Sequence, residues 1–227
     1  MKKKRVHSII LARGGSKGIK NKNLIKFNNK PLIYWTVMQS LKSKKIDEVW
    51  VSSDSKKILS VSKNLGAKII KRPKKFSGDT SSSESALIHA IKTIKVINLK
   101  DDLVVFPQVT SPLRKADDFD NALNKFKKEK KDSLFSGFYF EVYFSWKFIN
   151  KKIIPTYNLN KRPRRQKIFK NIIENGSFYI FKVDGFLKNK IRLFGNIGCF
   201  IMNIENSFQI DEKKDLKFFK LISNKKN

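Results

Sequence analysis

The chain has 227 residues, a mass of 26.4 kDa and a formal net charge of +31, because 50 basic side chains face 19 acidic ones. This length suits one α/β domain with a sizeable core. A hydrophobic fraction of 40% excludes a disordered chain, and the apolar runs are too short to span a membrane. Cys199 is the only cysteine, so we expect a soluble protein of the reducing cytoplasm.

The positive charge first suggests an anionic partner such as a nucleic acid. However, only eight of the 50 basic residues are arginines, and the excess of lysine, isoleucine, asparagine and phenylalanine is typical of an AT-rich coding bias. We favour this explanation of the charge. A nucleic-acid-binding protein remains the remote alternative, and it would need a basic face with interleaved aromatic residues.

The first 130 residues alternate strand-like and helix-like segments, judged by apolar periodicity and by Gly, Pro and Asp boundaries. In chain order we expect a strand at 6–12, a helix beginning at Pro31, a strand at 48–53, a helix over 55–65, a strand at 67–70, a helix over 83–96, a strand at 103–106 and a helix around 119–126. This alternation predicts a mostly parallel sheet with helices on both faces.

After residue 132 the pattern changes to short aromatic strands, at 138–144, 178–181 and 199–203, around a basic stretch at 161–166. We predict a single domain, 1–227, in which residues 135–185 form a protruding insert. The chain should return to the sheet near Asn196. We also expect Ile210 and Asp211 to end a strand before the last helix.

Ligands of open parallel sheets bind beyond the carboxyl ends of the strands, so the loops that follow the strands are the candidate site. The first loop, 11–23, has glycines that allow close approach to an anion, and Arg13, Lys17 and Lys22 could neutralise phosphates. Its spacing fits neither a dinucleotide-binding nor a P-loop motif. A glycine turn with solvated lysines is the competing interpretation.

Two further loops carry polar groups. The serines of 80–83 could cap the helix that follows, or they could bind a nucleotide base at its free backbone amides. Gln108 follows the strand at 103–106, where its amide could orient a polyhydroxylated ligand; a Ser-Pro turn that starts the next helix is the alternative.

The last candidates lie in the second half of the chain. Arg164 and Arg165 are adjacent arginines in a lysine-rich chain, and arginine binds carboxylates and phosphates in a bidentate manner that lysine cannot reproduce. A basic surface turn remains possible for them. Asp211 could hold Mg²⁺ through an oxygen atom, although a helix N-cap is the more common role of such an aspartate.

Taken in order, these motifs resemble those of the acylneuraminate cytidylyltransferases, also called CMP-sialic acid synthetases, over nearly the whole chain. The matching segments are 12–19 with Lys22 and Asn23, Arg72-Pro73 with 79–83, Gln108 with 110–112, 164–166, 174–179, and 210–211 with Asp215.

The resemblance implies a Rossmann-like fold of the nucleotide-diphospho-sugar transferase type. It also implies a reaction in which CTP and a nine-carbon α-keto acid sugar give a CMP-sugar and pyrophosphate, with Mg²⁺ as cofactor. The insert of the family dimerises and reaches into the partner's site, so we expect a homodimer.

The resemblance also assigns roles to residues. For the nucleotide, Arg13 and Lys22 would hold the triphosphate with Asn23 beside it, and Arg72, Ser81 and Ser83 would bind the cytidine. For the sugar, Gln108 and Tyr179 would contact it, and Arg165 would bind its carboxylate or steady the transition state. Asp211 would ligate Mg²⁺. Lys22 and Arg165 are the candidate catalytic residues.

Two positions bear on how far the resemblance extends. Gln209 stands where members of the family often carry a second acidic residue, so metal binding would depend on Asp211 and the phosphates. Gly18 stands where pseudaminic acid enzymes typically carry arginine, which favours a substrate of the N-acetylneuraminate or legionaminate type. A pseudaminate enzyme, or a GTP-dependent enzyme acting on a sugar 1-phosphate, is the alternative.

Overall fold

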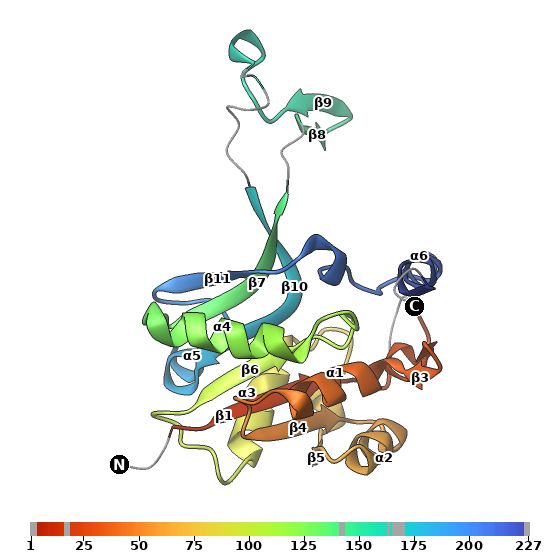
Figure 1. The fold of residues 1–227 in the computed structure, drawn as a ribbon, viewed down its shortest axis with the longest axis vertical. Coiled ribbons are helices and arrows are strands. Elements are labelled where there is room, and N and C mark those ends of the chain that lie inside the picture. The colour runs from red at the N-terminus through yellow and green to blue at the C-terminus, as the bar shows by residue number, and fades with distance from the viewer. Residues whose placement is uncertain (1–3, 16–18, 141–143, 163, 165–170, 225–227) are drawn as a thin grey trace.

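A seven-stranded sheet forms the centre of the computed structural model, which describes residues 4–15, 19–140, 144–162, 164 and 171–224 (Figure 1). The strand order is β11-β7-β10-β6-β1-β4-β5. The strands are β1 (Val6–Leu11), β4 (Glu48–Ser53), β5 (Lys68–Lys71), β6 (Leu103–Pro107), β7 (Ser133–Phe140), β10 (Asn171–Lys182) and β11 (Ile197–Ile201). The four strands of the first half of the chain lie within one or two residues of the predicted ranges.

Most of this sheet is parallel. β1 pairs in parallel with β4 and with β6, β4 with β5, and β11 with β7. β10 runs antiparallel to both of its neighbours, β6 and β7. The predicted mostly parallel sheet is therefore confirmed, with one reversed strand from the second half of the chain.

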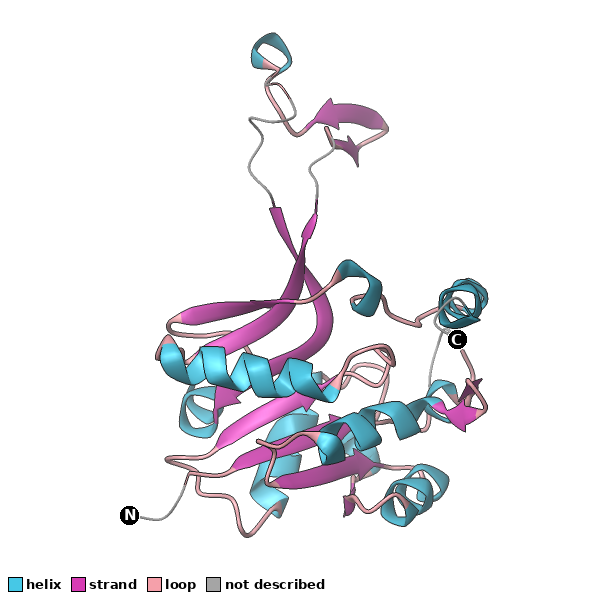
Figure 2. Cartoon of the chain, viewed as in Figure 1, coloured by secondary structure: helices cyan, strands magenta, loops and turns pink. Residues whose placement is uncertain are grey.

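Helices cover both faces of the sheet, as Figure 2 shows. α1 (Leu32–Lys42), α2 (Lys56–Asn64) and α4 (Ala116–Lys128) pack on one face, and α3 (Ser83–Thr93) and α5 (Val183–Asn189) pack on the other. Successive strand residues point to opposite faces, so Ile9 packs with α3 while Ile10 packs with α1. Both faces of the central strands β1 and β6 are buried, which explains their nearly continuous apolar sequences.

Smaller elements frame one end of the sheet. The 3₁₀ turn η1 (Lys22–Leu24) is followed by the hairpin β2 (Lys26–Phe27) and β3 (Lys30–Pro31), and the last helix, α6 (Lys213–Asn224), packs on this hairpin. The rings of Phe27 and Phe219 meet edge to face with centroids 5.9 Å apart. Further 3₁₀ turns are η2 (Lys74–Phe76) and η5 (Ile204–Asn206). None of the described helices has the length and apolar character needed to cross a membrane.

A two-stranded ribbon projects from the sheet. β7 and β10 continue past their neighbours and lead to the hairpin β8 (Trp146–Ile149) and β9 (Lys152–Pro155) and the turn η3 (Leu159–Lys161), at the far end of the molecule (Figure 1). The predicted insert boundaries, 135 and 185, were too wide. Residues 133–137 and 174–182 pair within the main sheet, because their apolar side chains pack against α4 and α5, and only the segment between them projects.

The predicted strand at Ile210 and Asp211 was wrong. Ile210 lies in an irregular segment, where its backbone N–H donates to the carbonyl of Thr110 at 2.8 Å, and α6 begins at Lys213. Asp215 in the first turn of α6 accepts hydrogen bonds from the backbone N–H groups of Asp211 and Glu212, at 2.8 and 2.7 Å. This carboxylate satisfies free amides at the helix start and suits the positive end of its dipole.

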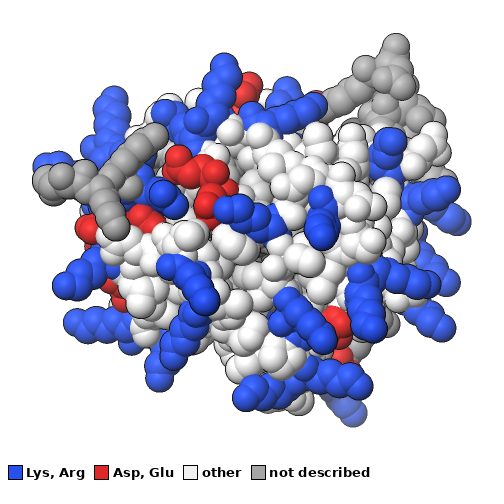
Figure 3. Space-filling view, turned by 90° about the horizontal axis from the view of Figure 1, so that it is seen from below, with Lys and Arg blue, Asp and Glu red and all other residues white. Residues whose placement is uncertain are grey.

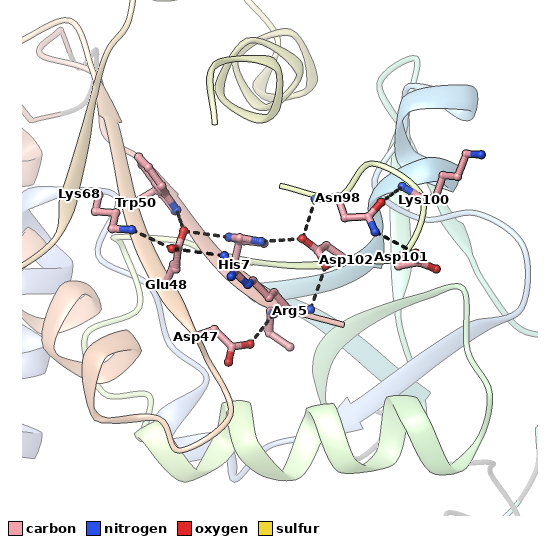
Figure 4. A network of polar contacts seen from close by, with 11 residues as sticks. Arg5, His7, Asp47, Glu48, Trp50, Lys68, Asn98, Lys100, Asp101 and Asp102 are labelled. Atoms are coloured by element: carbon pink, nitrogen blue, oxygen red, sulfur yellow. Dashed lines mark hydrogen bonds and ion pairs between the residues drawn. The ribbon is translucent and has the colours of Figure 1, made fainter. Parts of the chain in front are cut away.

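A polar network closes the amino end of β1 (Figure 4). His7 is fully buried, and its Nε2 lies 2.9 Å from Asp102 Oδ2 while its Nδ1 lies 3.5 Å from Glu48. Asp102 also accepts the backbone N–H groups of Arg5 at 2.9 Å and Asn98 at 2.8 Å. Burial raises the pKa of Asp102, but these backbone hydrogen bonds and His7 outweigh it and leave the pKa below its ordinary value.

The lowered pKa of Asp102 predicts a loss of stability in acid. A carboxyl group with a depressed folded pKa stabilises the protein above its unfolded pKa of about 3.9, and this contribution disappears as the pH falls through the folded pKa. Asp102→Asn should remove that dependence and lower the free energy of unfolding at pH 7 by about 2 kcal/mol, because the new amide cannot accept from every present donor. Urea titrations between pH 2 and 7 measure both effects. The exposed neighbour variant Asp101→Asn is the control, and an equal loss in that variant would contradict the assignment.

Candidate active site

A cavity of about 490 Å³ opens at the carboxyl ends of β1, β5 and β6, where an open parallel sheet presents its loops. Eight of the predicted site residues line it: Arg13, Lys22, Asn23, Arg72, Ser81, Ser83, Gln108 and Asp211. They come from four separate loops, which the fold brings to one place. Arg165, a further predicted residue, lies outside the described residues, as do Lys17 and Gly18.

Arg13 joins the first loop to the second across the cavity mouth. Its Nη1 donates to the carbonyl of Gly78 at 3.3 Å and to Asp79 Oδ1 at 3.2 Å. Asn23 is buried, and its Nδ2 donates to the carbonyl of Arg13 at 2.9 Å. Asn23 therefore fixes the backbone of the loop from which the Arg13 guanidinium projects.

Lys22 and Asp211 form an ion pair in the cavity wall. Lys22 Nζ lies 2.8 Å from Asp211 Oδ1, and Asp211 has 56% of its side chain exposed. An exposed pair of this kind adds little stability, on the order of 0–1 kcal/mol. Since the pair is weak, a polyanion that enters the cavity can compete for the ammonium group at little cost.

Arg72 is the cation held most deeply in the cavity. It follows β5 and is 5% exposed, yet its Nε and Nη2 are buried without a hydrogen-bond partner among the described residues. Burial lowers the pKa of Arg72, the Asp54 charge raises it, and the Arg13 charge lowers it further. Buried donors without partners are costly, so this guanidinium is arranged to receive acceptor atoms from a ligand.

Gln108 presents a second unfilled donor. Its Nε2 is buried and has no partner within the described part of the chain, while its backbone N–H donates to the carbonyl of Ser177 at 2.9 Å. The backbone of Gln108 is thus anchored to β10, and the side-chain amide in the cavity wall is available to a ligand.

The serines of the second loop divide their roles. Ser82 caps α3, because its Oγ accepts the backbone N–H of Ser85 at 3.1 Å, so the capping interpretation is confirmed for this residue. Ser81 donates from Oγ to the carbonyl of Lys75 at 3.0 Å and lines the cavity together with Ser83. Ser83 and Ala86 of α3 line the same space, and the positive end of the helix dipole favours an electron-rich ligand there.

Tyr179 lies behind the cavity and does not line it. It is 5% exposed, its ring stacks on Phe106 with centroids 6.1 Å apart, and Phe106 forms part of the cavity wall. Its hydroxyl donates to Glu174 Oε1 at 2.5 Å. Burial, followed by Glu174, raises the pKa of Tyr179 to about 12. Its assignment to the sugar remains a prediction.

Sequence reasoning missed an ion pair, between Arg192 and Glu84, that lies beside the stacked rings of Tyr179 and Phe106. Arg192 donates from Nε to Glu84 Oε1 at 2.8 Å, and its guanidinium lies 4.8 Å from the Tyr179 ring centre and 5.3 Å from that of Phe106. The partners are 108 residues apart, so no local pattern could reveal the pair.

Gln209, noted above as a departure from the family pattern, braces two loops. Its Oε1 accepts from Thr110 Oγ1 at 3.2 Å, and its Nε2 donates to the carbonyl of Asn175 at 2.5 Å. A carboxylate at this position could not make the second hydrogen bond. Gln209 thus links the loop after β6 to the bulge in β10.

The residues present fit Mg²⁺ only in company with phosphate groups. Within the described ranges, no three His, Cys, Asp or Glu side chains gather as a metal site. Asp211 offers an exposed carboxylate in the cavity wall. Mg²⁺ is often bound by one or two carboxylates together with the phosphates of a substrate, and this single ligand is compatible with that pattern.

The sheet and the cavity at its carboxyl edge define the nucleotide-diphospho-sugar transferase architecture. The solved structure of a CMP:2-keto-3-deoxy-manno-octonic acid synthetase complexed with CTP matches with a TM-score of 0.72 at 17% identity, over 97% of this chain and 99% of that chain. A 4-diphosphocytidyl-2C-methyl-D-erythritol synthase from Anaerococcus prevotii matches with a TM-score of 0.66 at 12% identity, over 97% and 96%. At these identities the likeness establishes the fold.

The chain belongs to the cytidylyltransferase family, whose model matches residues 7–191. It is 36% identical over 184 residues to an N-acylneuraminate cytidylyltransferase of Oncorhynchus mykiss, covering 79% of this chain and 41% of that protein. It is 31% identical over 218 residues to a pseudaminic acid cytidylyltransferase of Campylobacter jejuni, covering 94% of each. The chain thus spans less than half the length of the fish protein and nearly all of the bacterial one. The family predicted from the motifs is confirmed.

Proposed function

We propose that this protein transfers the cytidylyl group of CTP to an acidic nine-carbon α-keto sugar and releases pyrophosphate. The observation that carries the proposal is the cavity with three cationic side chains from two loops, Arg13 and Lys22 after β1 and Arg72 after β5, of which Arg72 is buried with unfilled donors. Arg13 and Lys22 supply positive charge for the phosphates of a nucleoside triphosphate, and the unfilled donors of Arg72 suit the acceptor atoms of a base. The family is one of cytidylyltransferases.

In this reaction the anomeric hydroxyl oxygen of the sugar attacks the α-phosphorus of CTP. The new bond joins that oxygen to the α-phosphorus, the bond from the α-phosphorus to the bridging oxygen breaks, and the hydroxyl proton is lost to the medium. Such transfers depend mainly on positioning the reactants and neutralising charge.

The proposed roles of the described residues follow their positions in the cavity, and the role of Arg165 follows the motif resemblance. Arg13 and Lys22 hold the phosphates, and Asn23 keeps the Arg13 loop in place. Arg72 with Ser81 and Ser83 binds the cytidine at the start of α3, as the resemblance implies. Gln108 contacts the sugar, and Arg165 receives its carboxylate.

Mg²⁺ is the proposed cofactor, with Asp211 as the protein ligand. When bound, the ion supplies charge neutralisation for the phosphates. Before the phosphates bind, the Asp211 carboxylate pairs with Lys22 at the cavity wall. We place the reaction in the cytoplasm, where CTP is available.

We propose a sugar of the N-acetylneuraminate or legionaminate type, as the motifs indicated. Pseudaminate is the second candidate, because the pseudaminic acid cytidylyltransferase of C. jejuni is aligned over 94% of this chain. The test is pyrophosphate release from CTP and Mg²⁺ with N-acetylneuraminate, legionaminate, pseudaminate and the eight-carbon acid of the solved neighbour, with an active enzyme as positive control. No release with any nine-carbon acid would overturn the proposal.

A nucleic-acid-binding function has less support. Figure 3 shows lysines and arginines scattered over the visible face, with acidic groups among them, instead of gathered into one stripe. A nucleic-acid ligand would require such a stripe with aromatic residues for stacking. Release from a nucleic-acid column at modest salt is the result we expect.

We further propose a homodimer formed through the projecting ribbon. Its apolar side chains are strongly exposed, with Phe148 at 74%, Ile153 at 67% and Trp146 at 50%. A contiguous exposed apolar surface of this kind is typical of an interaction site. Light scattering should give twice the chain mass of 26.4 kDa, and Phe148→Asp should halve it. Leu99→Asp, at an exposed apolar site far from the ribbon, is the control, and a monomeric wild type would refute the dimer.

A further inference from the structure

Arg114 is a buried cation that the proposed chemistry does not use. It is 2% exposed and lies just before α4, where its guanidinium sits 4.8 Å from the ring centre of Phe119. Burial lowers the pKa of Arg114 to about 9, against the opposing charge of Asp118. No ion pair with a carboxylate is found for it within the described ranges, so its charge is met by neutral acceptors.

These acceptors belong to α1 and to the bulge in β10. Nη1 donates to the carbonyl of Ser177 at 2.6 Å and to its Oγ at 3.1 Å. Nη2 donates to Thr36 Oγ1 at 3.2 Å and to Gln39 Oε1 at 3.0 Å. The planar fork of arginine thus joins two elements 63 and 78 residues away in sequence.

The same two acceptors hold the backbone of Gln108. Its N–H donates to the Ser177 carbonyl at 2.9 Å, and its carbonyl accepts from Thr36 Oγ1 at 3.4 Å. Gln39 adds a third tie, since its Nε2 donates to the carbonyl of Pro112 in the same loop at 2.7 Å. Both polar groups of the Gln108 backbone therefore end on atoms that Arg114 also holds.

A contribution to stability does not by itself explain why a charged guanidinium is buried at Arg114. Apolar residues of similar volume can replace buried ionic groups with little loss, and sometimes with a gain. The guanidinium of Arg114, however, binds the Ser177 carbonyl and Thr36 Oγ1, the two groups that hold the backbone of Gln108. The side chain of Gln108 presents an unfilled amide donor to the cavity. The arrangement fixes the backbone from which this amide projects.

We propose that Arg114 is a positioning residue, which holds Ser177 and Thr36 so that the side-chain amide of Gln108 is set to receive the sugar substrate. The inference rests on the proposed function. Arg114 touches no substrate; it acts on the sugar through the backbone of Gln108. Removing it should therefore change the use of the sugar and leave the use of the nucleotide nearly unchanged.

A double-mutant cycle in the full-length protein tests this role. Arg114→Met should lower kcat/KM for the acidic sugar about 100-fold, since small misplacements of a binding group have effects of that size, while KM for CTP stays near the wild-type value. Gln108→Ala should cause a loss at least as large. The double variant should be no worse than Gln108→Ala alone, because both changes remove the same contact.

Two further variants keep the test decisive. Arg114→Lys retains the charge but has one donor centre in place of the fork, so its kcat/KM should be higher than that of Arg114→Met. If Arg114→Met does not fold, Arg114→Lys replaces it in the double-mutant cycle with Gln108→Ala. Asp120→Asn is the matched control, because Asp120 is buried and accepts hydrogen bonds from Ser43 at 2.5 Å and Lys44 at 3.1 Å, away from Gln108.

The outcomes separate this inference from the proposed function. If wild-type protein forms no product with any acidic sugar, the proposed function fails. If the wild type is active but the losses from Arg114→Met and Gln108→Ala multiply, Arg114 does not act through Gln108. An equal rise in KM for CTP and for the sugar, or an equal loss in Asp120→Asn, would show a general structural role and overturn the inference.

Discussion

Replacing Lys22 by methionine should lower kcat/KM for cytidylyl transfer by about 100- to 1,000-fold, the usual effect of losing one preorganised electrostatic group at a reacting centre. Lys22 provides the ammonium group on the cavity wall, and its present partner is the exposed carboxylate of Asp211 at 2.8 Å. Methionine keeps the length of the side chain and removes its charge. Initial rates of pyrophosphate release at varied CTP measure the loss.

Two further variants test whether the loss of kcat/KM is specific to the charge of Lys22. Lys20→Met changes an exposed lysine of the same loop that does not line the cavity, and it should retain wild-type activity. Lys22→Arg keeps a positive charge and should retain more activity than Lys22→Met. Similar losses in Lys20→Met and Lys22→Met would mean that the loop responds to total charge, and Lys22 would lose its assigned role.

Gly176→Ala should reduce both stability and activity. Gly176 has φ = +61°, and a Cβ atom there would lie 2.3 Å from Gln209 Nε2, the atom that donates to the Asn175 carbonyl. The left-handed backbone costs an L-residue about 1–2 kcal/mol, and displacing the Gln209 amide removes a hydrogen bond worth about 1 kcal/mol. We expect a total loss of about 2–3 kcal/mol in the free energy of unfolding, measured by urea titration.

Gly15→Ala is the matched control for Gly176→Ala, since a Cβ atom at Gly15 meets nothing within 4 Å. It should leave the unfolding transition unchanged. The activity loss in Gly176→Ala has a separate cause, because the bulge carries Ser177, which anchors Gln108. Wild-type stability and kcat/KM in Gly176→Ala would show that the bulge tolerates a side chain and that Gln209 is no brace.

Much of the fold could be predicted because its signals are local. Strands at 48–53 and 103–106 are short apolar runs with polar boundaries, and the helix that starts at Ser83 follows a capping serine. The reversal of β10 and the limits of the ribbon could not be predicted. They depend on which strands pair across tens of residues, and the aromatic sequence of 171–182 suits a sheet strand as well as an insert strand.

Part of the site could be predicted from loops, because those after β1, β5 and β6 each follow a predicted strand and carry residues that line the cavity. Sequence could not show which of these residues act through others. Asn23 fixes the Arg13 loop, and Tyr179 lies behind Phe106 instead of in the cavity. Arg114 and Gln209 make contacts 34 to 99 residues away, and nothing in the local pattern distinguishes them from ordinary turn residues.

Four of the eight arginines now have a structural explanation. Arg13 and Arg72 lie in the cavity, Arg114 is a buried clamp, and Arg192 braces the aromatic layer behind the site. Arg114 uses its planar fork and Arg192 lies over aromatic rings, and lysine reproduces both contacts poorly. The lysines of α2 and β5 are mostly exposed. The charge of +31 therefore identifies no macromolecular partner by itself, and a general excess of positive charge can still steer anionic substrates.

The most direct test of cytidylyl transfer is the identity of the product. The protein is incubated with CTP, Mg²⁺ and the acidic sugar that gives the fastest pyrophosphate release, and the mixture is followed by phosphorus NMR and mass spectrometry. We predict a phosphodiester that joins CMP to the anomeric oxygen, formed in equal amount with pyrophosphate and dependent on the sugar. Release of pyrophosphate or phosphate without the sugar, or no CMP-sugar with any nine-carbon acid, would contradict the account.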